Sequence, residues 1–145
     1  MAPAADPAQP GGAEISLPVR TERDIVATRA AGRDLARMAG FGIADQTRFA
    51  TAISELVRNV IRHAGAGSCA LLRDQPDTKT IRIRALVEDH GPGIPDIALA
   101  MQEGFSTARG LGAGLPATRR LMHEFAIESQ PGYTQVRIGL TRRIV

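Results

Sequence analysis

The sequence predicts a two-layer α/β sandwich, in which helices cover one face of a mixed, mostly antiparallel sheet. Helical periodicity dominates the first half of the chain, whereas short β-type runs separated by turn residues dominate the second half. Such a separation of helices from strands is typical of an antiparallel sheet with helices packed on it. The length of 145 residues suits a single domain.

The domain is expected to begin at residue 14. Residues 1–13 are rich in Ala, Pro and Gly, a composition that buries little apolar area, so we expect a flexible tail followed by one domain over 14–145. Apolar and polar residues then alternate up to Val19, which predicts a short strand with one buried face.

Two helices are predicted next. Thr21, with Asp24 three residues later, resembles a capping arrangement, and the apolar stripe after it predicts a helix over about 22–39. From Phe49, apolar residues recur at three- and four-residue spacing without Pro or Gly, which predicts a long amphipathic helix that ends near His63.

The strands of the sheet follow. Two β-like runs over 68–72 and 79–88, joined by a turn at 74–77, predict a hairpin. The glycine-rich stretch 89–115 leaves room for one short helix at about 96–103.

The C-terminal elements close the sheet. Pro116 suits the first position of a helix that reaches Phe125. Runs over 126–129 and 133–141 then predict two strands around a Pro-Gly turn.

Composition excludes several classes of protein. With Cys69 as the only cysteine, the chain can form neither an internal disulfide nor a Cys/His zinc module. No apolar run is long enough to cross a bilayer and no signal peptide is recognisable, which predicts a cytoplasmic protein that does not enter the membrane. The net charge is only +3, and arginines are scattered among acidic residues with few aromatics, so we expect no nucleic-acid partner.

Glu55 and Asn59 form the first group of candidate functional residues. Their four-residue spacing places both side chains on one face of the long helix, a single turn apart, where they can share a ligand. A solvated helix face is the alternative interpretation.

Asp89 begins the second group. It follows an apolar strand, and Gly91 and Gly93 after it permit close backbone approach or a positive φ. An ordinary strand-to-helix turn is the alternative.

The third group is the segment Gly-Leu-Gly-Ala-Gly-Leu over 110–115. Its unobstructed N–H groups precede a helix N-terminus, and both features attract phosphate, although a flexible linker has the same composition. A P-loop is excluded because the Gly-Lys-Ser/Thr sequence is missing. A Rossmann site is excluded because these glycines do not follow the first strand of a βαβ unit.

Taken in order, the three groups resemble the N, G1 and G2 boxes of the GHKL ATPase superfamily, whose members share the Bergerat ATP-binding fold. The sequence of residues 101–116, together with Arg-Leu-Met-His-Glu-Phe at 120–125, is similar to that of the RsbT-type switch kinases of the bacterial stressosome pathway. The similarity covers about residues 15–141.

This resemblance implies ATP and Mg²⁺ as cofactors and a role for each box. Asp89 would accept a hydrogen bond from the adenine amino group, Asn59 would coordinate Mg²⁺ that bridges the phosphates, and Glu55 would be the catalytic general base. Gly91 and Gly93 would make room for the base. The other implied cofactor-binding residues are Ile94, Arg109, Gly110, Leu111, Gly112, Ala113, Gly114, Leu115 and Thr134, of which the glycines belong to a lid over the phosphates.

One box fits the pattern less closely, and the role of one further residue is open. The last box usually carries Gly-Thr, whereas one residue separates Gly132 from Thr134 in this sequence. Thr134 is the residue of this box that is expected to contact adenine. Arg109 has two open interpretations, as a phosphate contact or as a solvated side chain.

The function implied is that of an ATP- and Mg²⁺-dependent protein serine/threonine kinase. It would phosphorylate a STAS-domain antagonist on its scaffold and, when released, activate a PP2C-type phosphatase by binding. Alternatives are an anti-sigma factor of the same fold that acts by sequestration and a non-enzymatic binding module. A sensor histidine kinase is not expected because no helical hairpin with a phosphoacceptor His precedes the site.

Overall fold

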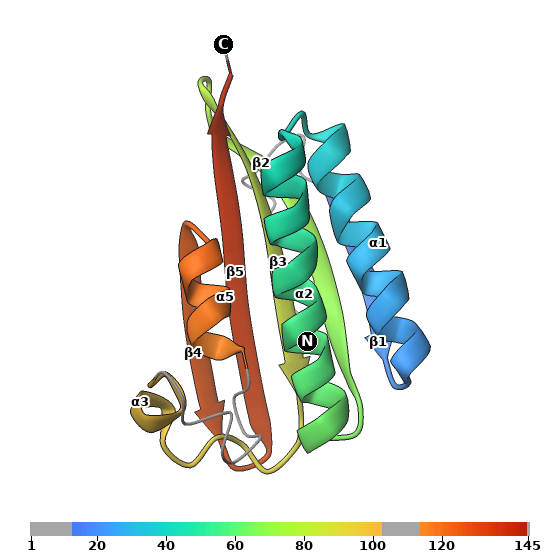
Figure 1. The fold of residues 1–145 in the computed structure, drawn as a ribbon, viewed down its shortest axis with the longest axis vertical. Coiled ribbons are helices and arrows are strands. Elements are labelled where there is room, and N and C mark those ends of the chain that lie inside the picture. The colour runs from blue at the N-terminus through green and yellow to red at the C-terminus, as the bar shows by residue number, and fades with distance from the viewer. Residues whose placement is uncertain (1–12, 103–113, 145) are drawn as a thin grey trace.

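The structure is a computed structural model that describes residues 13–102 and 114–144 (Figure 1). Residues 1–12 of the expected flexible tail and the site residues from Arg109 to Ala113 lie outside the described residues, whereas Ala13, expected in the tail, begins the first strand. The elements are β1 (Ala13–Val19), α1 (Glu22–Met38), α2 (Ile43–His63), β2 (Gly67–Asp77), β3 (Thr80–Asp89), α3 (Ile97–Ala100), α5 (Leu115–Leu121), β4 (Glu124–Gln130) and β5 (Tyr133–Arg143).

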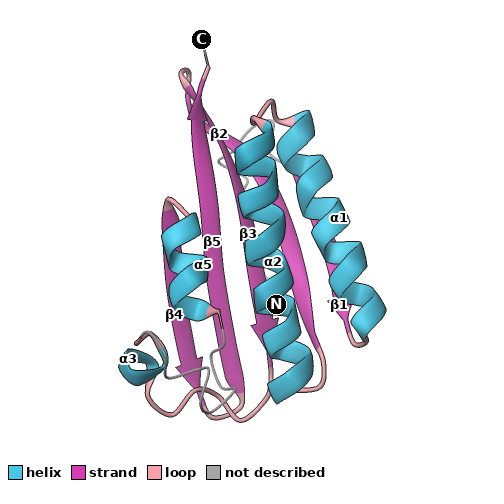
Figure 2. Ribbon diagram, in the orientation of Figure 1, coloured by secondary structure: helices cyan, strands magenta, loops and turns pink. Residues whose placement is uncertain are grey.

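The five strands form one sheet in the order β1-β2-β3-β5-β4. Every described pairing is antiparallel, so the described sheet lacks the parallel pair that a mixed sheet would contain. Helices α1, α2 and α5 lie on the same face of the sheet, with α2 over its middle (Figure 2). The prediction of a two-layer α/β sandwich is confirmed.

The core lies between α2 and the central strand β3. Phe49, Ile53 and Val57 on α2 are fully buried, as the three- and four-residue spacing predicts. On β3 the residues alternate between buried and partly exposed, with Ile83 and Ala85 facing the helices. Each large apolar side chain buried in this way stabilises the fold by about 1.5–3 kcal/mol.

The start of α1 confirms the predicted capping arrangement. One carboxylate oxygen of Asp24 accepts hydrogen bonds from the backbone N–H of Arg20 at 2.7 Å and of Thr21 at 3.0 Å. These bonds hold the pKa of Asp24 below its ordinary value, because they favour the charged form.

The first hairpin turns later than predicted. Strand β2 continues to Asp77, with a register irregularity between Asp74 and Asp77, and the chain reverses at residues 78–79. The carboxylate of Asp77 accepts a hydrogen bond from the Lys79 N–H at 2.7 Å, which closes the turn. Asp74 continues the strand because its buried carboxylate pairs with Arg82 on β3.

The prediction that the helix after Pro116 reaches Phe125 is wrong. Helix α5 ends at Leu121, and Phe125 lies on β4 opposite Ile138 of β5. Strand pairing and contact with the core determine the conformation at Phe125. The short helix α3 is also shorter than the predicted 96–103.

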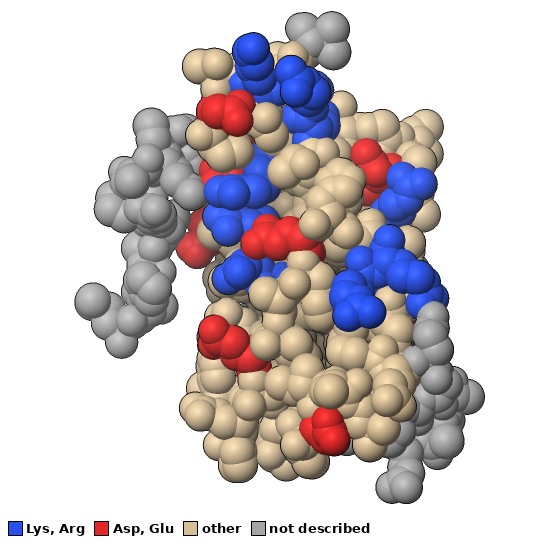
Figure 3. Space-filling view, turned by 90° about the vertical axis from the view of Figure 1, so that its left-hand side faces the viewer, with Lys and Arg blue, Asp and Glu red and all other residues tan. Residues whose placement is uncertain are grey.

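Charges of both signs lie on the described part of the surface. On the face seen in Figure 3, Lys and Arg side chains are interspersed with Asp and Glu. In the described part of the chain, no helix combines the length and the apolar character that crossing a bilayer requires.

Candidate nucleotide-binding site

The strand register brings three polar residues abreast at one end of the sheet. Thr134 on β5 lies opposite Asp89 on β3 and, on its other side, opposite Ser129 on β4. Side chains of directly opposed residues lie about 4.5–5.5 Å apart at Cβ. The three strands therefore present a polar row at the end of the sheet that adjoins the C-terminal half of α2.

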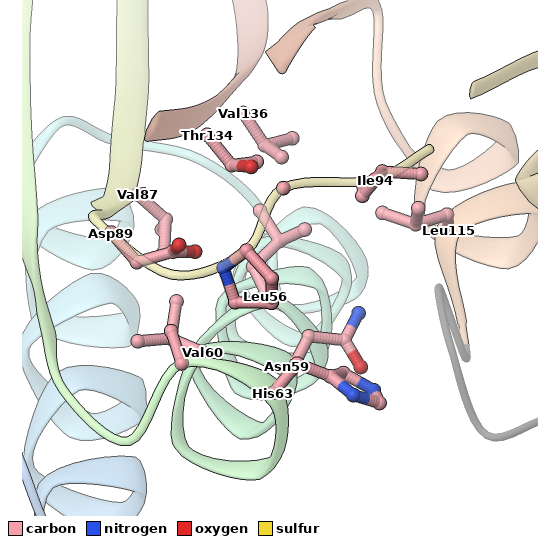
Figure 4. A pocket seen from close by; sticks show the side chains of 13 residues that line it. Leu56, Asn59, Val60, His63, Val87, Asp89, Ile94, Leu115, Thr134 and Val136 are labelled. Atoms are coloured by element: carbon pink, nitrogen blue, oxygen red, sulfur yellow. The ribbon is translucent and has the colours of Figure 1, made fainter. Parts of the chain in front are cut away.

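A pocket opens between this row and α2 (Figure 4). It contains about 500 Å³ of space free of protein atoms, and this space includes open solvent. The strands contribute Asp89 and Thr134, whereas α2 contributes Asn59 and His63. The remaining lining residues are mostly apolar: Leu56, Val60, Ala64, Val87, Pro92, Gly93, Ile94, Leu115 and Val136.

Asp89 is fixed by its own loop. Its Oδ1 accepts a hydrogen bond from the Gly91 N–H at 2.9 Å. This bond fixes the orientation of the carboxylate and leaves Oδ2 as an acceptor for a ligand in the pocket.

Gly91 and Gly93 are required by packing. A Cβ on Gly91 would lie 2.6 Å from the Cβ of Ala64 at the end of α2. Gly93 has φ +83°, and its Cβ would lie 2.6 Å from the carbonyl oxygen of Gln130. The loop after β3 therefore fits between α2 and the β4–β5 turn only with glycine at both positions.

One hydrogen bond ties this loop to β4, and a second joins β4 to β5. The Ile94 N–H donates to the Ser129 hydroxyl at 2.7 Å, and the hydroxyls of Ser129 and Thr134 are 2.6 Å apart. Thr134 is 6% exposed, so its hydroxyl meets the pocket rather than bulk solvent.

Sequence reasoning missed Ser129 and treated His63 as an ordinary helix residue. Ser129 could have been found from the position opposite Thr134 in the predicted hairpin. His63 lines the pocket one turn after Asn59, on the same face of α2.

Glu55 lies beside the pocket, at the contact between α2 and α5. Its Oε1 accepts a hydrogen bond from Arg58 at 2.8 Å, and a Cβ on Gly114 would lie 2.5 Å from its Oε2. Gly114 has φ +80° and directly precedes α5, whose first residue, Leu115, lines the pocket. The last glycine of the glycine-rich segment therefore lies directly against the carboxylate of Glu55.

The structure brings most of the described candidate residues together. Asn59, Asp89, Gly93, Ile94, Leu115 and Thr134 line one pocket, Gly91 lies in the loop that forms its wall, and Gly114 contacts Glu55 next to it. An apolar slot with a fixed carboxylate, a hydroxyl and an amide suits a flat heterocycle that carries hydrogen-bond donors and acceptors at its edge.

Comparison with known proteins agrees with this geometry. Residues 44–144 match the family described as histidine kinase-, DNA gyrase B- and HSP90-like ATPases. The serine/threonine-protein kinase RsbT of Bacillus subtilis (strain 168) is 49% identical over 114 residues, which are 79% of this chain and 85% of RsbT. The anti-sigma F factors of Caldanaerobacter subterraneus subsp. tengcongensis and Thermoanaerobacter sp. (strain X514) are 34% identical over 85 residues, which are 57% of this chain and 59% of each relative.

The match to the family extends over more than half of the chain, and the similarity to RsbT extends over most of both proteins. This chain therefore belongs to the histidine kinase-, DNA gyrase B- and HSP90-like (GHKL) ATPases, and within them to the RsbT-like serine/threonine kinases.

Proposed function

We propose that the pocket binds ATP with the adenine against Asp89 and Thr134. The observation that carries this proposal is the polar row at the end of the sheet, where a fixed carboxylate oxygen and a buried hydroxyl face the same apolar slot. Adenine carries an amino donor next to a ring-nitrogen acceptor. A carboxylate beside a hydroxyl can pair with both atoms.

The residues present are compatible with Mg²⁺ held jointly by the protein and the nucleotide. In the described residues no group of three or more His, Cys, Asp or Glu side chains could hold a metal alone. The amide oxygen of Asn59 is the type of oxygen ligand that Mg²⁺ accepts, and phosphates and waters ordinarily complete its shell. When bound, Mg²⁺ would neutralise phosphate charge, and Asn59 would help to position the phosphates next to Glu55.

We assign Glu55 the role of general base. Its carboxylate lies one turn from Asn59 on α2 and is held by Arg58 on one oxygen, with the backbone of Gly114 beside the other. In this role it accepts the proton of a protein serine or threonine hydroxyl as that oxygen attacks the γ-phosphoryl group, and ADP leaves. Arg109 and residues 110–113 would lie next to the phosphates.

The proposed substrate is a STAS-domain antagonist protein on its scaffold, and the proposed second partner is a PP2C-type phosphatase that the released kinase activates. The similarity to RsbT supports this proposal. In this role the protein acts in the cytoplasm, with neither nucleic acid nor membrane as a partner.

The test is phosphoryl transfer from radiolabelled ATP with Mg²⁺ to candidate STAS proteins, measured beside ATP binding by calorimetry. Glu55→Gln should keep ATP affinity within about threefold and lower transfer by about 100-fold or more, as expected for loss of a general base. Glu22→Gln, an exposed carboxylate at the start of α1, is the matched control. Transfer at the normal rate by Glu55→Gln would exclude this residue as the base.

Sequestration of a sigma factor is the second candidate function, because the relatives include anti-sigma F factors. It predicts a stable complex with a sigma factor that forms with ATP bound and needs no phosphoryl transfer. Transfer to a STAS protein without any sigma-factor complex would exclude it.

A further inference from the structure

Glu55 forms an ion pair with Arg58 on the same helix, next to the pocket. The Arg58 guanidinium donates a hydrogen bond to Oε1 of Glu55 at 2.8 Å, and both residues belong to α2. Both side chains are partly covered, with 40% of Arg58 and 33% of Glu55 exposed. Among the described residues, the pocket lining includes Asn59 but neither member of this pair. Arg58 therefore contacts the proposed general base without lining the pocket that is proposed to hold adenine.

The carboxylate of Glu55 is confined on two sides. A glutamate side chain has several rotatable bonds, and its freedom has to be lost before it can act in one geometry. Efficient catalysis requires a reacting group to be held within about 0.5 Å and 10–20° of the productive geometry. In Glu55, Arg58 holds Oε1, whereas Oε2 lies against the backbone of Gly114, where a Cβ would be 2.5 Å away. Arg58 thus supplies the hydrogen bond that orients the carboxylate.

We infer that Arg58 is a positioning residue for phosphoryl transfer, which orients Glu55 so that Oε2 receives the proton of the substrate hydroxyl. The pair lies on one helix, and the buried residues Phe49 and Val57 fix that helix in the core. Its geometry is therefore set within a rigid element. This inference rests on the proposed role of Glu55 as the general base.

An ion pair that only decorates the helix surface is the alternative interpretation, and α2 contains a second pair that represents it. The Arg48 guanidinium donates to Oδ1 of Asp45 at 2.8 Å, with the same three-residue spacing. The exposed fractions of these side chains are 49% and 31%, close to those of Arg58 and Glu55. Exposed pairs of this kind contribute little to stability. Comparison of the two pairs therefore separates positioning of the base from stabilisation of the helix.

The test measures kcat and KM for phosphoryl transfer from radiolabelled ATP with Mg²⁺ to the candidate STAS proteins. Arg58→Met removes the charge and keeps a long side chain, and it should lower kcat about tenfold because the base is no longer oriented. The KM values for ATP and for the STAS protein should stay within about twofold, since Arg58 holds the base and neither substrate. Arg58→Lys, which keeps a donor for one carboxylate oxygen, should restore most of kcat.

Two further variants complete the test. In a Glu55→Gln background, Arg58→Met should lower kcat no further, because a residue that acts through Glu55 has no effect once the base is lost. Arg48→Met is the matched control and should keep the wild-type kcat. Denaturant unfolding should show the same small loss of stability in Arg48→Met and Arg58→Met.

Four results would overturn the inference. They are a wild-type kcat in Arg58→Met, a raised KM for ATP as the main effect of that variant, an equal loss of kcat in Arg48→Met, and a further loss of kcat in the Glu55→Gln background. Normal transfer by Glu55→Gln, or the absence of transfer to any STAS protein by the wild-type protein, would instead overturn the proposed function, and this inference with it.

Discussion

Replacing Gly93 by alanine tests whether the loop after β3 must lie where it does for nucleotide to bind. Two costs can be worked out from the structure. The φ of +83° places Gly93 in the left-handed region, where a residue with a Cβ is strained by about 1–2 kcal/mol. The Cβ would also lie 2.6 Å from the carbonyl oxygen of Gln130, so loop and strand end must separate by about 0.8 Å to reach ordinary contact.

The second effect, the displacement of the loop, changes the shape of the pocket. Gly93 is flanked by Pro92 and Ile94, and all three line the pocket. A displacement of this size misplaces the wall against which the base would lie, and we expect ATP affinity to fall about tenfold or more. Calorimetric titration with ATP gives the affinity, and denaturant unfolding gives the free energy of unfolding.

Gly65 offers a matched control. Its φ is +84°, but a Cβ there would have no atom within 4 Å. Gly65→Ala should therefore lose the same 1–2 kcal/mol of stability, about the cost of the strained backbone, without loss of ATP affinity. Wild-type affinity in Gly93→Ala, or equal loss of affinity in Gly65→Ala, would refute the reasoning.

Two further predictions concern stability. Arg142→Ala should lower the free energy of unfolding by about 1–2 kcal/mol, because the Arg142 guanidinium donates a hydrogen bond to the carbonyl of buried Ala39 at 2.8 Å. Denaturant unfolding measures this loss of stability, with Arg143→Ala as the control. The pKa of Asp24 is lowered in the folded state, so its contribution to stability is present at neutral pH and is lost as the pH falls below 3.8. Asp24→Asn should flatten that acid dependence in denaturant titrations at a series of pH values, and an unchanged dependence would contradict this reasoning.

The helices and the strands were predictable where local pattern and tertiary packing agree. On α2 the apolar spacing that predicts a helix also supplies the buried face, from Phe49 to Val60. The predicted hairpin at the C-terminus rests on a Pro-Gly turn, and Gly132 does take a positive φ there. Because Glu55 and Asn59 lie on α2, their proximity followed from the helix alone.

Prediction was wrong where a contact distant in sequence determines the structure. Nothing local ends helix α5 at Leu121, since neither Gly nor Pro follows before Phe125. The chain leaves the helix because the His123 N–H donates to the carbonyl of Gly139 at 3.0 Å and β4 then pairs with β5. Asp74 extends β2 for a similar reason, through its buried pairing with Arg82.

Prediction of the site from the sequence is limited in the same way. The acidic strand end and the glycines after it were visible as a motif, but Ser129 is linked to that motif through Ile94, which is 35 residues away in the chain. A single sequence gives the spacing of Ser129 and Thr134 across the turn, yet not the N–H group of Ile94 that binds the Ser129 hydroxyl.

The end of the pocket that is proposed to hold adenine is held together by hydrogen bonds within the protein. The Gly132 N–H donates to the carbonyl of Gly91 at 3.0 Å, and the Ile94 N–H donates to Ser129, so the loop is attached both to β4 and to the turn between β4 and β5. These bonds hold the segments that carry Asp89 and Thr134 in place, so few protein groups have to become ordered when a base enters the pocket. The entropy cost of binding is therefore small. We therefore expect adenosine alone to bind measurably in calorimetry, and a complete dependence of binding on the triphosphate would contradict this account of the pocket.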